Sequence, residues 1–249
     1  MTAPLFLVPV GSLGAEDEGG PRTLKLDGPE GRHAADVQRI GVGQEVLVAD
    51  GQGRMASCTV RAAGKGCLEL EVRSGWTVEE PRPRLVLVQA LAKGDRDLLA
   101  VEAATELDVD EVVPWQADRS IVRWRAERAD KAHRKWVQTA ITATKQSRRP
   151  RVPVVADLTT RQGLVRRVAE AALTLVLHEG ADEPLAQVSL PDDGEVLLVV
   201  GPEGGISPEE LTALAAAGAR PVRLGPTVLR TSSAGPAALA VLNARDRWR

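Results

Sequence analysis

From residue 85 to the end of the chain, short apolar runs alternate with segments of helical length. This alternation predicts a parallel sheet whose strands are joined by crossover helices. We therefore expect an α/β domain that carries the chemistry of the protein. The expected strands cover residues 85–91, 110–114, 173–179 and 196–200, and the expected helices include residues 95–107, 129–146 and 160–171.

The first part of the chain has a different rhythm, with short alternating runs separated by turns. The motif "DGQG" at 50–53 is a hairpin signal, and "GKG" at 64–66 is a second one. Strands at this spacing predict a small β barrel. With 249 residues the chain can form two ordinary domains, and "PRP" at 81–83 marks a linker. We predict a β-rich domain over 1–74 and the α/β domain over 75–249.

Composition narrows the class of protein. Hydrophobic residues make up 43% of the chain and charged residues 27%, as in soluble globular proteins. No basic segment precedes the short apolar stretch at the start, and no run approaches the ~18 apolar residues of a membrane span. We therefore expect a cytoplasmic protein with no membrane partner. Cys58 and Cys67 stand alone and the histidines are scattered, so neither a metal site nor a disulfide is expected.

One segment, "VVGPEGGISPEELTALAAAG" at 199–218, combines a buried-type strand, a glycine loop and a capped helix. Ser207 and Glu210 fit a capping box, and Gly218 is a typical C-terminal stop. Ligands of open α/β sheets lie beyond the carboxyl ends of the strands, in loops of this kind. The loop is therefore a candidate ligand site, although the alternative is that its glycines only form a tight turn.

The glycine loop does not match the two common phosphate-binding motifs. A P-loop needs Lys followed by Ser or Thr after its last glycine, whereas Ile206 and Ser207 follow Gly205 here. The spacing of the dinucleotide fingerprint is also broken, and Glu203 stands where a pyrophosphate would lie. An anionic ligand is therefore disfavoured, and a neutral or cationic one is predicted.

A second loop follows in "VRLGPTVLRTSSAGPAALAVLNA", residues 222–244. A short strand meets Gly225, and we expect a helix that starts near Ser233 with Pro236 in its first turn. Arg230 is the one charged residue in a small and apolar loop. Its alternative role is a surface salt bridge, but a cation isolated between two ligand-type loops is a functional candidate.

Basic residues concentrate in the middle of the chain. Eleven lysines and arginines lie between residues 119 and 151, although the formal net charge of the whole chain is -2. Trp115, Trp124 and Trp136 are interleaved with them. Arginine contacts to phosphates and aromatic stacking on bases are features of RNA binding. For Trp136 we favour the alternative that it faces the core, because alanines follow it at helical spacing.

Further arginines lie in or beside the predicted turns of the β-rich domain. They can face RNA or can be ordinary solvated charges. The sequence "KQSRRPR" at the end of a predicted helix is a second candidate contact for RNA phosphates. The residues that we expect to contact RNA are Arg22, Arg32, Arg39, Arg148 and Arg149.

Together, "GPEGG" and the "LGP…VLRT" that follows about twenty residues later resemble the signature of the SPOUT-class methyltransferases. The chain specifically resembles the RsmE-type 16S ribosomal RNA (uracil-N3)-methyltransferases. The likeness extends over nearly the whole chain, through "RH…RIGVGQEV", "LAKGDRDLLAVEAATELDVDEVVPWQADRS" and "KQSRRPRVP". It implies an N-terminal PUA-like β barrel for RNA, a C-terminal α/β trefoil-knot (SPOUT) domain, S-adenosylmethionine as methyl donor, ribosomal RNA or the small ribosomal subunit as partner, and a homodimer.

The resemblance also implies roles for residues. Transfer to uracil N3 also needs stabilisation of the negative charge that spreads onto O2 and O4, and Arg230 is the candidate for this role. Related sequences usually read Leu-Arg-Thr-Glu-Thr, whereas Ser232 replaces the glutamate here, so the identity of a general base does not carry over. The positions matched to cofactor binding are Leu177, His178, Glu179, Gly201, Pro202, Glu203, Gly204, Leu224, Gly225, Val228, Leu229, Thr231 and Ser232.

Two other functions stay open at this point. One is a different SPOUT methyltransferase, which acts on a ribose 2′-oxygen or on another base. The other is an RNA-binding assembly factor that retains the fold without catalysis. A Rossmann-fold methyltransferase is disfavoured, because the chain lacks its early glycine-rich loop and its Asn/Asp-Pro-Pro-aromatic motif.

Overall fold

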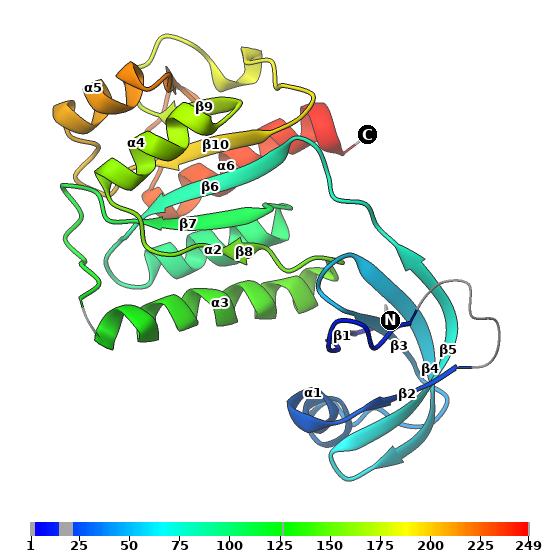
Figure 1. The fold of residues 1–249 in the computed structure, drawn as a ribbon. Helices are drawn as coiled ribbons and strands as arrows, with labels where there is room; N and C mark the ends of the chain where they lie inside the picture. Colours follow the sequence, from blue (N-terminus) through cyan, green and yellow to red (C-terminus); the bar gives the residue numbers. More distant parts are fainter. Residues whose placement is uncertain (1–2, 15–21, 126, 249) are drawn as a thin grey trace. The chain divides into compact units, whose positions relative to one another are not determined.

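The computed structural model of the chain describes residues 3–14, 22–125 and 127–248, with the side chains of Arg22 and Glu127 outside this description. The chain divides into two compact units (Figure 1). The N-terminal unit comprises Met1–Glu80 together with Thr144–Val152. The C-terminal unit comprises Pro81–Ala143 together with Pro153–Arg249.

A five-stranded sheet in the order β1-β3-β4-β5-β2 forms the N-terminal unit. Strand β1 pairs parallel with β3, and the other neighbours are antiparallel. Both predicted hairpins are confirmed, between β3 and β4 and between β4 and β5. The elements are β1 (Leu5–Leu7), β2 (Arg22–Leu26), α1 (Gly28–Arg32), the π-helical turn η1 (His33–Val37), β3 (Glu45–Ala49), β4 (Arg54–Gly64) and β5 (Cys67–Thr77).

The core of this unit is built from alternate residues of the strands, because successive side chains of a strand point to opposite faces. Phe6, Val48 and Leu70 are fully buried in it. Cys58 lies in the same cluster, and burial raises the pKa of its thiol to about 11. This cysteine is therefore a small apolar core residue and not a reactive thiol.

A segment distant in sequence completes the N-terminal unit. Lys145 Nζ lies 2.7 Å from Glu30 Oε1. The Arg151 guanidinium donates to the carbonyl oxygens of Gln52 and Val78. Gly53 allows this approach, because a Cβ at that position would clash with the Arg151 guanidinium and would lie 2.7 Å from the Val78 carbonyl oxygen. The N-terminal unit therefore includes residues 144–152, which a single domain boundary along the sequence would assign to the C-terminal unit.

The C-terminal unit contains a six-stranded parallel sheet in the order β11-β9-β10-β6-β7-β8. Helices cover both of its faces (Figure 1). The strands are β6 (Arg84–Ala90), β7 (Glu111–Trp115), β8 (Val154–Val155), β9 (Leu173–Leu177), β10 (Glu195–Val200) and β11 (Arg220–Val222). The helices are α2 (Arg96–Glu106), α3 (Glu127–Ser147), α4 (Arg161–Glu170), the 3-10 turn η2 (Leu185–Gln187), α5 (Pro208–Ala216), α6 (Thr231–Leu242) and the π-helical turn η3 (Asn243–Arg247).

Strand β6 shows how the two faces of the sheet are filled. Its residues Leu85 and Leu87 pack with buried side chains of α2, α3 and α6. The alternate residues Val86 and Val88 pack with side chains of α4 and α5. A strand buried on both faces needs a continuous apolar run, which is the pattern of residues 85–88. The predicted alternation of strands and helices is confirmed.

Helix α3 is amphipathic over its 21 residues. Trp136, Ala140 and Ala143 are buried, as predicted for a core-facing side. Its opposite side carries exposed lysines and arginines. Among the described residues, no helix combines the length and the apolar composition needed to cross a membrane.

Helix α6 starts earlier than predicted. It begins at Thr231 and not near Ser233, so Pro236 lies inside the helix and not in its first turn. The reason is that Arg230, with φ -66° and ψ 151°, is the N-cap residue. Its carbonyl oxygen accepts hydrogen bonds from the amides of Ser233 and Ala234 at 2.9 and 3.0 Å.

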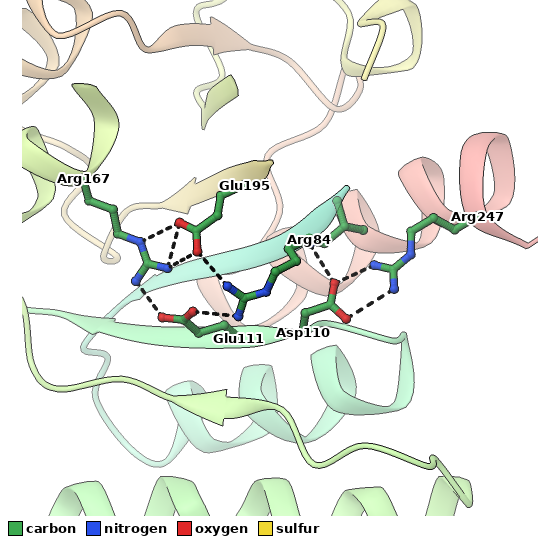
Figure 2. Close-up of polar contacts among 7 residues, drawn as sticks. Arg84, Asp110, Glu111, Arg167, Glu195 and Arg247 are labelled. Carbon is green, nitrogen blue, oxygen red and sulfur yellow. Dashed lines mark hydrogen bonds and ion pairs between the residues drawn. The ribbon is translucent and has the colours of Figure 1, made fainter. Parts of the chain in front are cut away.

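Ion pairs close the amino end of the parallel sheet (Figure 2). Arg84 pairs with Glu111 at 3.2 Å and with Glu195 at 2.9 Å. Arg167, on α4, pairs with the same two carboxylates at 2.6 and 3.0 Å. Burial alone would lower the pKa of Arg167, but the two glutamates outweigh it and raise the pKa. Each charge in this group of four therefore has two opposite charges beside it.

A further pair lies beside this group of four. Arg247 Nη1 donates to Asp110 Oδ2 at 2.9 Å, and the Leu85 amide donates to the same oxygen at 2.8 Å. Burial raises the pKa of Asp110, while Arg247 and the Leu85 amide oppose the rise. These contacts join η3 to the starts of β6 and β7.

Candidate functional site

A cavity of about 510 Å³ opens at the carboxyl ends of the parallel strands, where α/β sheets bind their ligands. Segments after β6, β7, β9 and β10 contribute to its wall, together with the loop that leads into α6. A smaller hollow adjoins it and shares Leu177, His178 and Glu179 with it. The segments that the sequence places far apart therefore meet at one edge of the sheet.

The glycine loop is both a tight turn and a wall of this cavity. Gly205 has φ +72°, which glycine adopts without strain. A Cβ on Gly201 would lie 2.6 Å from Ile206 Cγ1, so the turn leaves no room for a side chain. Arg119 Nη1 donates to the Gly204 carbonyl at 3.1 Å. The loop therefore combines a tight turn with a position on the cavity wall.

The capping box that follows the loop is confirmed. Ser207 Oγ accepts from the Glu210 amide at 3.1 Å, and Glu210 Oε2 accepts from the Ser207 amide at 3.0 Å. Glu210 is fully buried, and its second oxygen accepts from the Asp118 amide at 2.8 Å. The Asp118 carboxylate in turn accepts from Ser207 Oγ at 3.1 Å. This network fixes the glycine loop against the loop that follows β7.

Thr231 connects three segments beneath the cavity. Its hydroxyl accepts from Gln89 Nε2 at 2.9 Å and donates to the Gly201 carbonyl at 2.8 Å. Gln89 is fully buried near the end of β6, and Thr231 is 7% exposed. The start of α6 is therefore held against the glycine loop by neutral hydrogen bonds.

Opposite charges line the cavity at separate places. Glu203 Oε1 accepts from Arg96 Nη1 at 2.9 Å and from the Lys93 amide at 3.3 Å. Burial alone would raise the pKa of Glu203, but its backbone hydrogen bonds and Arg96 outweigh burial and lower it. Arg230 is exposed, and its guanidinium has no hydrogen-bond or ion-pair partner among the described residues. The wall thus holds an ionised carboxylate and an unused guanidinium.

Most of the predicted cofactor positions lie in this region. Leu177, Glu179, Thr231 and the predicted residues of the glycine loop line the larger cavity with Val228 and Leu229. Leu224 and Gly225 line only the smaller hollow, and Ser232, partly buried in the first turn of α6, lines neither. Five further lining residues were not selected from the sequence, and these are Arg96, Arg119, Val200, Ile206 and Ala234.

The sequence contained a signal that could have identified two of these residues, Arg96 and Arg119. Arg96 and Arg119 follow β6 and β7, and the carboxyl ends of neighbouring parallel strands meet at one edge of a sheet. A search of every segment that follows a predicted strand would have included both arginines.

The residues predicted to contact RNA lie in different environments. Arg32, Arg39 and Arg148 are exposed, whereas Arg149 is only 7% exposed. Arg148 takes a left-handed conformation with φ 56°, and the Arg149 amide then donates to the Thr144 carbonyl at 3.0 Å. This turn directs Arg148, and not Arg149, to solvent. Arg22 lies in β2, and its side chain is outside the described set.

The residues present suit a sulfonium donor that carries no phosphate. The ionised Glu203 favours a cation, and the glycine loop offers backbone groups at close range. Leu177, Val228 and Leu229 add apolar surface. Among the described residues, no cluster of three or more histidine, cysteine or acidic side chains could hold a metal ion.

Comparison with known proteins agrees with this geometry. The family described as "RNA methyltransferase domain" matches residues 78–243, and the one described as "RNA methyltransferase PUA domain" matches residues 26–73. Ribosomal RNA small subunit methyltransferase E of Mycobacterium bovis is 46% identical over 228 residues, which cover 90% of this chain and 87% of that protein. The Bacillus subtilis protein of the same name is 30% identical and covers 89% and 90%.

Solved structures extend the comparison to the fold. A methyltransferase from Legionella pneumophila with bound S-adenosylmethionine aligns with a TM-score of 0.85, 27% identity and 98% coverage of both chains. Ribosomal RNA small subunit methyltransferase E from Neisseria gonorrhoeae, bound to the same molecule, aligns with a TM-score of 0.83, 25% identity and 98% coverage of both chains.

These likenesses confirm the predicted fold class, which is an N-terminal PUA-like unit followed by an α/β SPOUT methyltransferase unit. The family match covers the unit that contains the cavity at the carboxyl ends of β9 and β10, so both observations indicate that this unit is the methyltransferase domain. The chain belongs to the family of RNA methyltransferases that includes the RsmE-type small-subunit ribosomal RNA enzymes.

Proposed function

We propose that this protein transfers the methyl group of S-adenosylmethionine to N3 of a uridine in 16S ribosomal RNA. The observation that carries the proposal is the cavity in which Glu203, the glycine loop and the unpaired Arg230 meet. The relatives that share about nine-tenths of the chain's length are named as small-subunit ribosomal RNA methyltransferases, which supports the choice of substrate.

The proposed cofactor site is formed by three segments of the C-terminal unit. Residues 177–179 and 201–204 offer backbone groups and the Glu203 carboxylate to the cofactor. Val228 and Leu229 offer it an apolar surface. When bound, the cofactor supplies a methyl group activated by a sulfonium cation. Thr231 keeps the glycine loop in place through the Gly201 carbonyl. The donor is thus oriented before the RNA arrives, which favours in-line transfer.

Arg230 is the proposed catalytic residue. Uracil N3 carries a proton and becomes nucleophilic only as this proton leaves, which spreads negative charge onto O2 and O4. A guanidinium without a protein partner can donate to these oxygens as the charge develops. Ser232 stands where related sequences carry a carboxylate, so we assign it no role as a base.

The RNA contacts that we propose for the N-terminal unit use its exposed arginines. Arg32, Arg39 and Arg148 are accessible for phosphate contacts. Arg148→Ala should weaken RNA binding and reduce by about one the slope of log affinity against log salt. Fluorescence anisotropy of labelled 16S fragments at several salt concentrations measures this slope. An unchanged slope would place the phosphates elsewhere.

We also propose that the protein acts as a homodimer in the cytoplasm, where ribosomal subunits are found. Large apolar side chains are exposed on the C-terminal unit, with Leu99 at 55%, Ile121 at 75% and Val228 at 79% exposed. A second copy that covers them would reduce their contact with water. Light scattering after gel filtration should give twice the chain mass, and the monomer mass would contradict the dimer.

The experiment that tests the function uses labelled S-adenosylmethionine with purified small ribosomal subunits and with free 16S RNA. Nucleoside mass spectrometry should recover the label as 3-methyluridine from small-subunit RNA. Label in a ribose or in another base would reject N3 of uracil and indicate a different SPOUT methyltransferase. Cofactor binding without transfer to any RNA would indicate a non-catalytic RNA-binding protein.

A further inference from the structure

We infer that the C-terminal unit holds a second nucleotide-binding site, which takes an unpaired RNA nucleotide with an amino-bearing base. The site is a hollow of about 410 Å³ between the first half of α3 and residues 157–158, which follow β8. It shares no lining residue with the cofactor cavity. The inference rests on the proposed function, since it assumes that the substrate is RNA.

Trp124 provides the stacking surface of this hollow. Its ring meets that of Trp136 edge to face, with centroids 5.5 Å apart and an interplanar angle of 86°. Trp136 is 1% exposed and belongs to the core, whereas Trp124 is only partly buried. The outer ring is therefore held by the inner one before any ligand arrives. An aromatic side chain held in this way stacks a base at little cost in conformational entropy.

His133 fixes the geometry of the hollow. Its Nε2 lies 3.2 Å from the Val155 carbonyl oxygen and 3.1 Å from the Ala156 carbonyl oxygen. Both partners are acceptors, so Nε2 carries the hydrogen. The ring thereby connects α3 to β8 and holds the two walls together.

The polar groups of the hollow select the kind of base. Asp130 and Asp157 are exposed there, and neither has a hydrogen-bond or ion-pair partner among the described side chains. A carboxylate accepts hydrogen bonds from the exocyclic amino group of cytosine, adenine or guanine. Uracil has no amino group, so the hollow suits a neighbour of the target uridine better than the uridine itself.

Cations on the same helix suit the phosphates of this nucleotide. Arg134 lines the hollow, and Arg128 and Lys131 are exposed on the two preceding turns of α3. None of the three has an ion-pair partner among the described side chains. Phosphate contacts by such residues fix the register of the RNA, and the carboxylates then read the base.

The position of the hollow suits a strand that also reaches the cofactor cavity. Arg119 lines the cavity and Trp124 lines the hollow, only five residues further along the same loop. At about 3.6 Å per residue, their Cα atoms lie no more than about 18 Å apart. One single strand of a few nucleotides can therefore place a uridine in the cavity and a nearby base on Trp124.

Binding of short RNA tests this site directly. Fluorescence anisotropy compares a labelled oligonucleotide of adenosine and cytidine with one of uridine only, on the cofactor-loaded full chain. The wild type should prefer the first. Trp124→Ala should weaken its binding by about 5- to 140-fold, the range expected for loss of one stacked base. Trp124→Phe should keep most of the affinity, and Trp248→Ala, which removes another exposed tryptophan, should keep all of it.

A second variant tests the choice of base without removing the tryptophan. Replacing Asp130 and Asp157 with alanine should reduce the ratio of the two affinities, while the melting temperature stays unchanged. If Trp124→Ala fails to fold, the ratio measured on this double variant decides the matter alone. An unchanged ratio, or equal binding of the two oligonucleotides by the wild type, overturns the inference.

Methyl transfer separates this inference from the proposed function. With the wild type active on small subunits, Trp124→Ala should raise KM for the subunits and leave kcat and cofactor affinity nearly unchanged. If the wild type methylates no RNA, the proposed function fails, while the oligonucleotide preference still tests the hollow. If the wild type methylates RNA and Trp124→Ala has its full affinity and KM, only the hollow fails.

Discussion

The two ends of the six-stranded sheet use charge in opposite ways. At the amino end, Arg84 and Arg167 each pair with both Glu111 and Glu195 (Figure 2). At the carboxyl end, Arg230 has no such partner among the described residues. Glycines, neutral hydrogen bonds such as those of Thr231, and the solvent-accessible pair of Glu203 with Arg96 shape the wall there. The same strands thus begin in a compensated ionic group and end in a cavity.

This difference indicates which charges are structural. A partly buried charge is tolerated when opposite charges surround it, and such pairs contribute mainly to the fold. A guanidinium that lines a cavity without a partner contributes little to the fold and can act on a ligand. Mutations at the two ends should therefore separate stability from turnover.

The largest effect is expected at the carboxyl end. Arg230→Ala should lower the rate of methyl transfer by about 10²- to 10³-fold, because one donor to the developing uracil charge is lost. The melting temperature and the affinity for S-adenosylmethionine should stay nearly unchanged. Single-turnover kinetics and calorimetry measure these quantities, with Arg166→Ala on α4 as a surface-arginine control. An equal loss of rate and cofactor affinity would place Arg230 in the cofactor site.

The next effect is expected at the amino end. Glu111→Ala removes a carboxylate with 7% residue exposure and leaves Arg84 and Arg167 sharing only Glu195. The free energy of unfolding should fall by about 2–3 kcal/mol, somewhat less than for a fully buried pair. Urea unfolding measures this change, with the exposed Glu102→Ala on α2 as control. Cofactor affinity at low denaturant should not change, and a loss of affinity in the folded variant would refute the separation of the two ends.

Thr231 should give an intermediate result at the carboxyl end. Thr231→Val keeps the shape of the side chain but leaves Gln89 Nε2 with only the Ala90 carbonyl as acceptor and removes the Thr231 donor from the Gly201 carbonyl. Such a loss costs about 1–3 kcal/mol. Since the glycine loop forms the cavity wall, we expect weaker cofactor binding together with a modest loss of stability. Calorimetry with S-adenosylmethionine tests this, and Thr212→Val on α5 is the control. Full cofactor affinity would mean that the loop keeps its shape without Thr231.

The smallest effect is expected for Glu203, whose pKa is lowered in the folded state. A lowered folded-state pKa stabilises the fold above the unfolded pKa of about 4.3 and loses this effect as the pH falls through the folded value. At pH 7, Glu203→Gln should therefore destabilise by less than about 1 kcal/mol, as for other solvent-accessible pairs. The difference should shrink as the pH falls below about 4.3 and vanish only below the folded-state pKa of Glu203. Urea unfolding at pH 7 and at acidic pH measures the difference in stability between the wild type and Glu203→Gln, with Glu209→Gln as control. A difference that does not change with pH would contradict a lowered pKa of Glu203 in the folded state.

Local signals in the sequence predicted the elements of the fold well. The alternation of apolar runs and helical segments predicted the parallel sheet. Strands and helices are recognised by the pattern of apolar residues within a short stretch of sequence, so neighbouring residues suffice for this prediction. The capping box of Ser207 and Glu210 was predictable for the same reason, since its partners are three residues apart. The prediction failed at the start of α6, where Arg230 and not a serine is the N-cap residue.

For the site, the sequence by itself determined the two loops at 201–205 and 224–232 and the isolation of Arg230 within a small, apolar segment. Only the tertiary structure buried Arg149 and surrounded Arg167 with two carboxylates. Glu111 and Glu195 lie 56 and 28 residues from Arg167, and no local period encodes such a meeting. Local interactions therefore determine which elements form, whereas the packing of the sheet decides which charges are compensated and which stay available for RNA.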